Sequence, residues 1–289
     1  VLRTTIVLCR PIEFEAMAKR TSGKGFQVLR SLIKDVEVPP PLKPHEEALV
    51  KKIFASSVSQ RMKSLSSSER AEDLPAWDGP EIAFAGRSNV GKSTLINALT
   101  SSTIMKTSKT PGRTQQLHFI SVGGRAGTRP DLSLVDMPGF GFANAPKSMV
   151  DDFHRLVGRY IKHRTNANLK RGTVERISIR RGITSVDTDF MEFLENLGTT
   201  FQLVFTKVDT LNASGVDKTL MSAQDCIHNF MMMHPITHLV SSKDNIGMRE
   251  LRNEIVSVSG LIYGHTKAQR RAIRESLDDL KDPTQEDKP

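Results

Sequence analysis

The chain has 289 residues, of which 38% are hydrophobic, and a formal net charge of +9. This length predicts one or two globular domains, and the only two cysteines, Cys9 and Cys226, exclude a disulfide framework and are expected to be reduced. Because no apolar run approaches the ~18 residues of a membrane span, we expect no membrane partner.

The first 73 residues are predicted to be an N-terminal extension. Residues 1–34 are rich in Lys and Arg, which is mildly similar to material near an organellar targeting segment. After a proline-rich linker, apolar residues recur at helical spacing from Leu49 to Leu65. We therefore expect an amphipathic helix at about 45–65, followed by a polar loop that reaches residue 73.

From Glu81 onward, predicted strands alternate with predicted helices. This alternation indicates an α/β domain with a mostly parallel six-stranded sheet and helices on both faces. We place the domain at 74–265 and a charged tail at 266–289. The expected strands are 82–85, 117–122, 132–135, 177–179, 201–205 and 236–240, and the expected helices are one beginning near Leu95 and those at 149–165, 187–198, 216–231 and 247–259.

The first of these strands leads directly into a glycine-rich loop of the form G-x-x-x-x-G-K-[ST]. In such a loop the backbone N–H groups and the N-terminus of the next helix surround the α- and β-phosphates of a nucleotide. The lysine reaches the β- and γ-phosphates, and the serine hydroxyl ligates Mg²⁺. The loop residues, all expected to bind the cofactor, are Gly86, Arg87, Ser88, Asn89, Val90, Gly91, Lys92 and Ser93.

Residues 110–115 are predicted to form a mobile switch loop between the first and second nucleotide motifs. We expect Thr114 to ligate Mg²⁺ and to act in catalysis, with Thr110 as the alternative, and Gly112 to lie at the nucleotide.

A D-x-x-G motif, Asp136 to Gly139, follows the strand at 132–135. Its position places the Asp136 carboxylate near the metal through a water and the Gly139 N–H near the γ-phosphate. The next residue is Phe140, which cannot orient an attacking water by hydrogen bonding, so unaided hydrolysis is expected to be slow. Two replacements are open: Asn89 resembles an Asn that holds K⁺ in related proteins, or a partner supplies the missing group. Asn89 as a plain loop-capping side chain is the alternative.

Two further motifs predict guanine selectivity. Thr206, Lys207 and Asp209 follow the strand at 201–205, and the Asp209 carboxylate can accept hydrogen bonds from the guanine N1–H and 2-amino group, which adenine lacks. The stem of Lys207 is expected to pack on the base. After the last predicted strand, a backbone N–H in the stretch Ser241, Ser242 and Lys243 can bind the guanine O6 atom.

The segment 155–181 holds the densest positive charge, with Glu175 as its one acid. Such a run predicts either an RNA-binding surface or a solvated cationic face. Its nine basic residues are Arg155, Arg159, Lys162, Arg164, Lys170, Arg171, Arg176, Arg180 and Arg181.

Together these motifs resemble the EngB (YihA) ribosome-biogenesis GTPases of the TrmE–Era–EngA–EngB group. The stretches that carry the resemblance are 80–99, 110–115, 136–141 and 206–209. The resemblance implies a Mg²⁺-dependent enzyme that binds and hydrolyses GTP. It also implies an assembly factor whose partners are the immature large ribosomal subunit, with its rRNA and ribosomal proteins, and other assembly factors. A GTP-stabilised rRNA-binding factor without hydrolysis is the alternative.

The extension and the tail depart from the family pattern. An organellar homologue would explain both, so we expect a mitochondrial location, with plastid or cytoplasm as alternatives.

Overall fold

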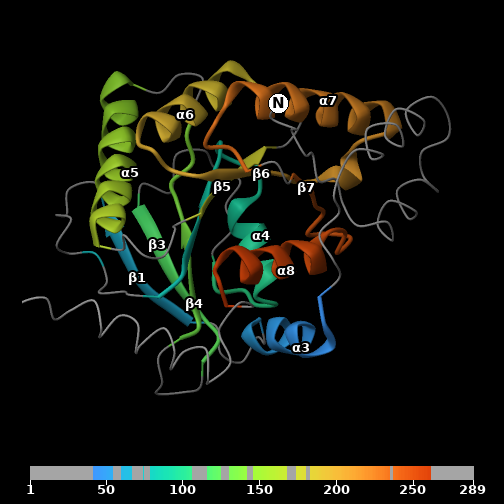
Figure 1. Cartoon of the computed structure of the whole chain (residues 1–289). Coiled ribbons are helices and arrows are strands. Elements are labelled where there is room, and N and C mark those ends of the chain that lie inside the picture. The colour runs from blue at the N-terminus through green and yellow to red at the C-terminus, as the bar shows by residue number, and fades with distance from the viewer. Residues whose placement is uncertain are drawn as a thin grey trace, which may run out of the picture.

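A seven-stranded sheet forms the centre of the chain in the computed structural model (Figure 1). The structure describes residues 42–54, 60–66, 74, 79–105, 116–124, 130–141, 146–167, 174–179, 183–234 and 237–261. The strands, in chain order, are β1 (Gln60–Ser66), β2 (Glu81–Ala85), β3 (Gln116–Val122), β4 (Leu132–Asp136), β5 (Val174–Ile179), β6 (Phe201–Phe205) and β7 (His238–Leu239).

The strand order across the sheet is β1-β3-β4-β2-β5-β6-β7. Strands β4, β2, β5, β6 and β7 run parallel to one another, whereas β3 pairs antiparallel with both β1 and β4. Strands β4, β2, β5 and β6 lie next to one another in the sheet, and in the sequence they alternate with helices. The predicted α/β class and the mostly parallel sheet are therefore confirmed.

Helices cover both faces of this sheet, because each parallel connection needs a crossover. Buried residues of α5, α6 and α7 share one core cluster with one face of the strands. Buried residues of α3, α4 and α8 share a second cluster with the other face. The helices are α3 (Pro44–Ile53), α4 (Lys92–Leu99), α5 (Lys147–Ala167), α6 (Ser185–Asn196), α7 (Ala213–Asn229) and α8 (Met248–Val258), and a 3₁₀ turn η3 spans Val208–Thr210.

The N-terminal part of the described chain differs from the sequence prediction. The expected helix at 45–65 is wrong in its second half, since α3 ends at Ile53 and residues 60–66 form the edge strand β1. The helical spacing of apolar residues predicts the structure correctly up to Phe54, and Val50, Ile53 and Phe54 are buried in the core. Beyond it, pairing with β3 decides the conformation, and that long-range contact leaves no local pattern. The sheet accordingly has seven strands instead of six.

A buried ionic cluster fastens α5 to the start of β2. Arg164 Nε donates to Glu81 Oε1 at 3.0 Å, and the Tyr160 hydroxyl donates to the same oxygen at 2.7 Å. Arg164 and Glu81 are 3% and 4% exposed in their side chains. Burial raises the pKa of Glu81, while Arg164 and Tyr160 oppose that shift. Removing Arg164 or Glu81 alone would leave an uncompensated buried charge, so the ion pair fixes the C-terminal part of α5.

Within the described residues, no helix is long and apolar enough to cross a membrane.

Candidate nucleotide-binding site

The predicted motifs gather at one edge of the sheet. Strands β2, β4, β6 and β7 are parallel, so their carboxyl ends face the same way. The four motif segments 86–93, 136–139, 206–209 and 241–243 begin at or just beyond those ends. Ligands of open α/β sheets bind at this edge, outside the carboxyl ends of the strands.

The phosphate-loop segment adopts a compact, strained conformation between β2 and α4. Asn89 has φ of 63° and Gly91 has φ of 108°, both in the left-handed region. Lys92 curls back over the loop, and its Nζ donates to the carbonyls of Gly86 at 2.8 Å and Arg87 at 3.4 Å. Burial lowers the pKa of Lys92, and the charge of Asp136 opposes this shift. The lysine is thus held beneath the loop, beside the carboxylate of β4.

Ser93 and Asp136 meet where a metal ion is expected. The Ser93 hydroxyl donates to Asp136 Oδ2 at 2.7 Å, which joins the start of α4 to the end of β4. Asp136 is 1% exposed, and none of the described residues donates a hydrogen bond to its Oδ1. Burial raises its pKa, whereas Lys92 and Ser93 lower it. A buried carboxylate with an oxygen lacking a donor fits a cation, because oxygen ligands are those that Mg²⁺ prefers.

The D-x-x-G segment touches the phosphate loop directly. A Cβ on Gly139 would lie 2.8 Å from the Cα of Ser88, so only glycine fits this approach. The next residue bonds to the loop through its backbone, with Phe140 N donating to Gly86 O at 3.4 Å and Ser88 N donating to Phe140 O at 3.1 Å. A change of conformation at Gly139 therefore affects the loop and Phe140 together.

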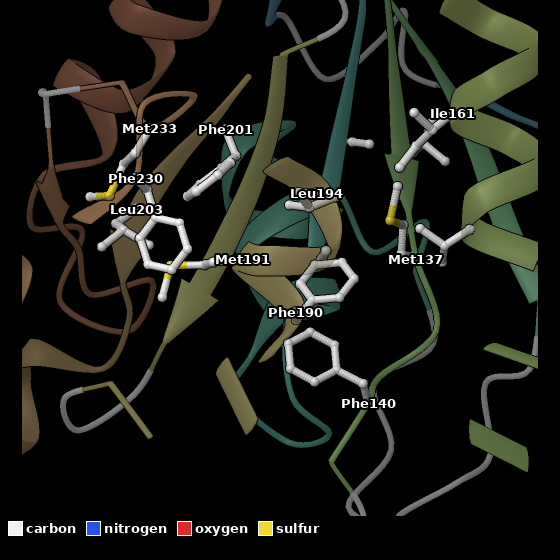
Figure 2. Close-up of a cluster of buried hydrophobic side chains, with 14 of the residues drawn as sticks. Met137, Phe140, Ile161, Phe190, Met191, Leu194, Phe201, Leu203, Phe230 and Met233 are labelled. Carbon is white, nitrogen blue, oxygen red and sulfur yellow. The ribbon is translucent and has the colours of Figure 1, made fainter. Parts of the chain in front are cut away.

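The ring of Phe140 points into the core and away from the expected position of the nucleotide. Its centroid lies 4.5 Å from that of Phe190 on α6 and 5.7 Å from that of Phe153 on α5. Figure 2 shows the Phe140 and Phe190 rings side by side at one end of the apolar cluster. This placement agrees with the sequence argument that Phe140 cannot orient water.

The guanine motif after β6 is tied to the phosphate loop. The buried Thr206 hydroxyl donates to Val90 O at 2.6 Å, and Lys207 Nζ donates to Asn89 O at 2.8 Å. Lys207 itself has φ of 58°. Thr206 thus bridges two motif segments.

Asp209 is oriented from the loop that follows the neighbouring strand β7. The Ser241 hydroxyl donates to Asp209 Oδ1 at 2.7 Å and accepts a hydrogen bond from Asp244 N at 3.1 Å. Backbone hydrogen bonds in both directions between Ser241 and Ile246 close the loop that follows β7. Sequence reasoning missed this contribution of 244–246, although Asn245 and the Gly at 247 are typical turn residues.

Not every predicted residue is brought into this arrangement. Gly112, Thr114 and Thr110 lie outside the described residues, and their roles stay predictions. Ser242 is half-buried and Lys243 is exposed.

In the basic segment, Arg155 and Lys162 are exposed and Arg159 is half-buried, whereas Arg164 is buried against Glu81. The expectation that Arg164 belongs to a surface run is therefore wrong, because its guanidinium is used inside the fold.

Comparison with known proteins gives consistent matches. The family described as "50S ribosome-binding GTPase" matches residues 81–207. A protein of Rhizobium etli named "Probable GTP-binding protein EngB" is 43% identical over 192 residues, which cover 65% of this chain and 87% of the relative. A protein of Afipia carboxidovorans with the same name is 41% identical over 189 residues, covering 65% and 84%. Among solved structures, Toc33 of Arabidopsis thaliana aligns with a TM-score of 0.48 at 14% identity, covering 65% of this chain and 86% of that one.

Proposed function

We propose that this chain, which belongs to the EngB family of GTP-binding GTPases, acts as a Mg²⁺-dependent assembly factor of the large ribosomal subunit. The observation that carries the nucleotide chemistry is the meeting of Lys92, Ser93 and Asp136 at the edge where Ser241 orients Asp209. The subunit assignment is supported by the family description, which names ribosome binding.

Mg²⁺ would be held by Ser93 and, through water, by Asp136, with Thr114 as a further ligand. When bound, the metal neutralises charge on the β- and γ-phosphates. Lys92 supplies a second positive charge at those phosphates, and the loop backbone around Gly91 supplies N–H donors. These groups are fixed before the nucleotide arrives, and such preorganisation lowers the barrier of a charged transition state.

Hydrolysis by the isolated protein should be slow, because the Phe140 ring is packed against Phe190. A K⁺ ion near Asn89 or a group from the ribosomal particle would complete the site. The exposed position of Asn89 at the loop surface favours either addition.

We place this activity in an organelle, with mitochondria preferred over plastids and the cytoplasm. The basic composition of residues 1–34 supports the proposal. Fractionation of cells that express the full-length protein with a C-terminal tag tests it, and a purely cytosolic signal would contradict it.

GTP turnover tests the proposed mechanism. The rate should be measured in K⁺ and in Na⁺ at equal ionic strength, each with and without large ribosomal subunits. We expect a slow basal rate and a faster rate with K⁺, with the particle, or with both. Asn89→Ala should remove the K⁺ effect but keep stimulation by the particle. If GTP binds and the protein sediments with subunits but no condition gives turnover, the protein is instead a non-hydrolysing structural rRNA-binding factor.

A further inference from the structure

The middle of α5 carries a row of cations on one flank, two of them exposed and one half-buried. Arg155, Arg159 and Lys162 lie within an arc of about 60° on the helix and span about 10 Å of its length. Arg155 has a side chain that is 59% exposed, and Lys162 is exposed. Arg155 forms an exposed ion pair with Asp152 at 3.3 Å, and the sequence from 155 to 167 contains no Asp or Glu. Hereafter, these three residues are called the α5 stripe.

The adjacent helix α6 carries the opposite charge. Its exposed face includes Asp189 and Glu192. The two helices are in contact, since the rings of His154 and Phe193 are 4.8 Å apart and a Cβ on Gly158 would lie 3.5 Å from Phe193. A polyanion is therefore attracted to the α5 stripe and repelled on the α6 side, which favours an approach along the outer flank of α5.

The other end of α5 is linked to the nucleotide site through aromatic rings. Phe153 contacts both Phe140, at 5.7 Å between centroids, and Phe190, at 5.6 Å. The Phe140 backbone is in turn bonded to the phosphate loop at Gly86 and Ser88. If the Gly139 N–H turns to a γ-phosphate, these backbone bonds rearrange, and the Phe140 ring moves with them.

Along α5, the stripe is flanked by the ring contact of Phe153 and by the hydrogen-bonded anchor at Glu81. Towards the C-terminus of α5, Arg164 anchors the helix to Glu81, and Tyr160, which lies between Arg159 and Lys162, donates to the same carboxylate. On its N-terminal side, Phe153 follows Phe140. A shift of Phe140 would then tilt α5 about the Glu81 anchor and displace Arg155 and Arg159 relative to the sheet.

We propose that the α5 stripe binds RNA phosphates and that the contact of Phe140 with Phe153 makes this binding depend on the nucleotide. The inference rests on the proposed function, because it names the surface and the regulation by which the GTPase would hold ribosomal RNA. Three cations on one flank suit the phosphate backbone of RNA, which needs charge but no base recognition.

The first test measures binding to protein-free large-subunit rRNA across a salt series. Substituting the stripe as Arg155→Ser, Arg159→Ser and Lys162→Ser should reduce the slope of log affinity against log salt by roughly 2–3, or about 0.7–0.9 per lost contact. The control changes Lys51, Lys52 and Arg249 to Ser, three cations on α3 and α8 at the other face of the sheet. The control should keep the parent slope.

An unchanged slope in the stripe variant would overturn the proposal. If that variant loses sedimentation with ribosomal particles while its slope on bare rRNA is unchanged, the partner of the stripe is an acidic protein, and the assignment to RNA is likewise overturned. GTP affinity measured in parallel confirms that each variant is folded. Should the parent protein fail to sediment with large subunits at all, the proposed function fails, whereas a loss confined to the stripe variant concerns this inference alone.

The second test separates coupling from packing. The parent should bind the rRNA with affinities that differ by about fivefold or more between GDP and a non-hydrolysable GTP analogue. Phe153→Leu should bring this ratio close to one without changing affinity for either nucleotide. Phe193→Leu removes a ring of the same cluster that contacts Phe190 and His154, and it should keep the ratio. If the two variants show the same ratio of rRNA affinities, or if the parent binds rRNA equally well with GDP and with the GTP analogue, the rings only fill space.

Discussion

At the scale of single residues, the hydrogen bond from Ser241 to Asp209 links two motifs that lie 32 positions apart. It orients the Asp209 carboxylate, which we expect to accept hydrogen bonds from the guanine base. The bond itself is worth about 1 kcal/mol, whereas the acceptor character of Asp209 decides which base can pair with it.

We expect Asp209→Asn to weaken GTP binding and to favour xanthosine triphosphate, since an amide can donate to the C2 carbonyl of xanthine. Competition between the two nucleotides against a fluorescent analogue measures the change. Ser241→Ala, as a control, should weaken both by less than about tenfold and leave their order unchanged. If Asp209→Asn binds GTP as tightly as the parent, the guanine contact lies elsewhere.

The thiol of Cys226 lies buried on α7, and burial raises its pKa from 9.0 to about 11, with Asp225 and Asp187 adding to the shift. In a Cys9→Ser background, iodoacetamide at pH 8 should therefore label the native protein slowly and the denatured protein fast. Because the folded pKa lies above the unfolded one, the Cys226 contribution to the free energy of unfolding falls as the pH rises from about 9 to about 11. Rapid labelling of the native protein would contradict this environment.

At the scale of elements, α3 belongs to the core of the GTPase domain. Its Val50, Ile53 and Phe54 pack in the cluster that contains the phosphate-loop helix α4. Arg252 of α8 completes the contact, since it donates to the carbonyls of Leu99 and Ala98 at the end of α4 and lies over the Phe54 ring. Three helices far apart in sequence are thus joined.

Ile53→Ala should lower the free energy of unfolding by about 2–5 kcal/mol, because the side chain is fully buried and its removal leaves a cavity. Urea denaturation followed by circular dichroism gives the value. Lys51→Ala, two residues away on the exposed side of α3, should change stability by no more than about 0.5 kcal/mol. A loss below 1 kcal/mol for Ile53→Ala would mean that α3 is only loosely attached.

The same elements show what the sequence could predict. Strands with continuous apolar runs, such as Phe201–Phe205, and helices such as α5 were found within a few residues, because their patterns are local. The edge strand β1 was missed, since its sequence Gln60–Ser66 is polar and only its partner β3 defines it. Arg164 was misplaced for a similar reason: a charge run reads as surface unless its buried partner, Glu81, is known.

At the scale of the whole molecule, the nucleotide site is assembled from four strand ends of one sheet. Ligand binding at such a site should stabilise the entire fold, because the motifs come from segments spread between residues 86 and 243. The motif residues were predictable because their chemistry demands fixed residue types, whereas their mutual contacts, such as Thr206 with Val90, needed the structure.

Mg·GDP at about 100 times its dissociation constant should raise the free energy of unfolding by about 2.7 kcal/mol. Thermal unfolding with and without nucleotide measures this gain. Removing Mg²⁺ with EDTA should reduce the gain, and Ser93→Ala should reduce the effect of EDTA. Equal stabilisation by GDP in the presence and absence of Mg²⁺ would argue against the metal role of Ser93 and Asp136.

The contact of Arg252 with the end of α4 also has a consequence for how the chain is made. The phosphate loop leaves the translating ribosome before the rest of the pocket, and the guanidinium that bonds to the end of its helix follows 153 residues after Leu99. At about 5–20 residues per second, that interval lasts roughly 8–30 s. Until Lys243 is synthesised, the nascent chain holds the phosphate loop without the complete guanine-binding half of the pocket. Selective capture of GTP therefore begins only after the segments 206–209 and 241–243 have been synthesised, and a nascent chain stalled before Thr206 should not distinguish guanine from other bases.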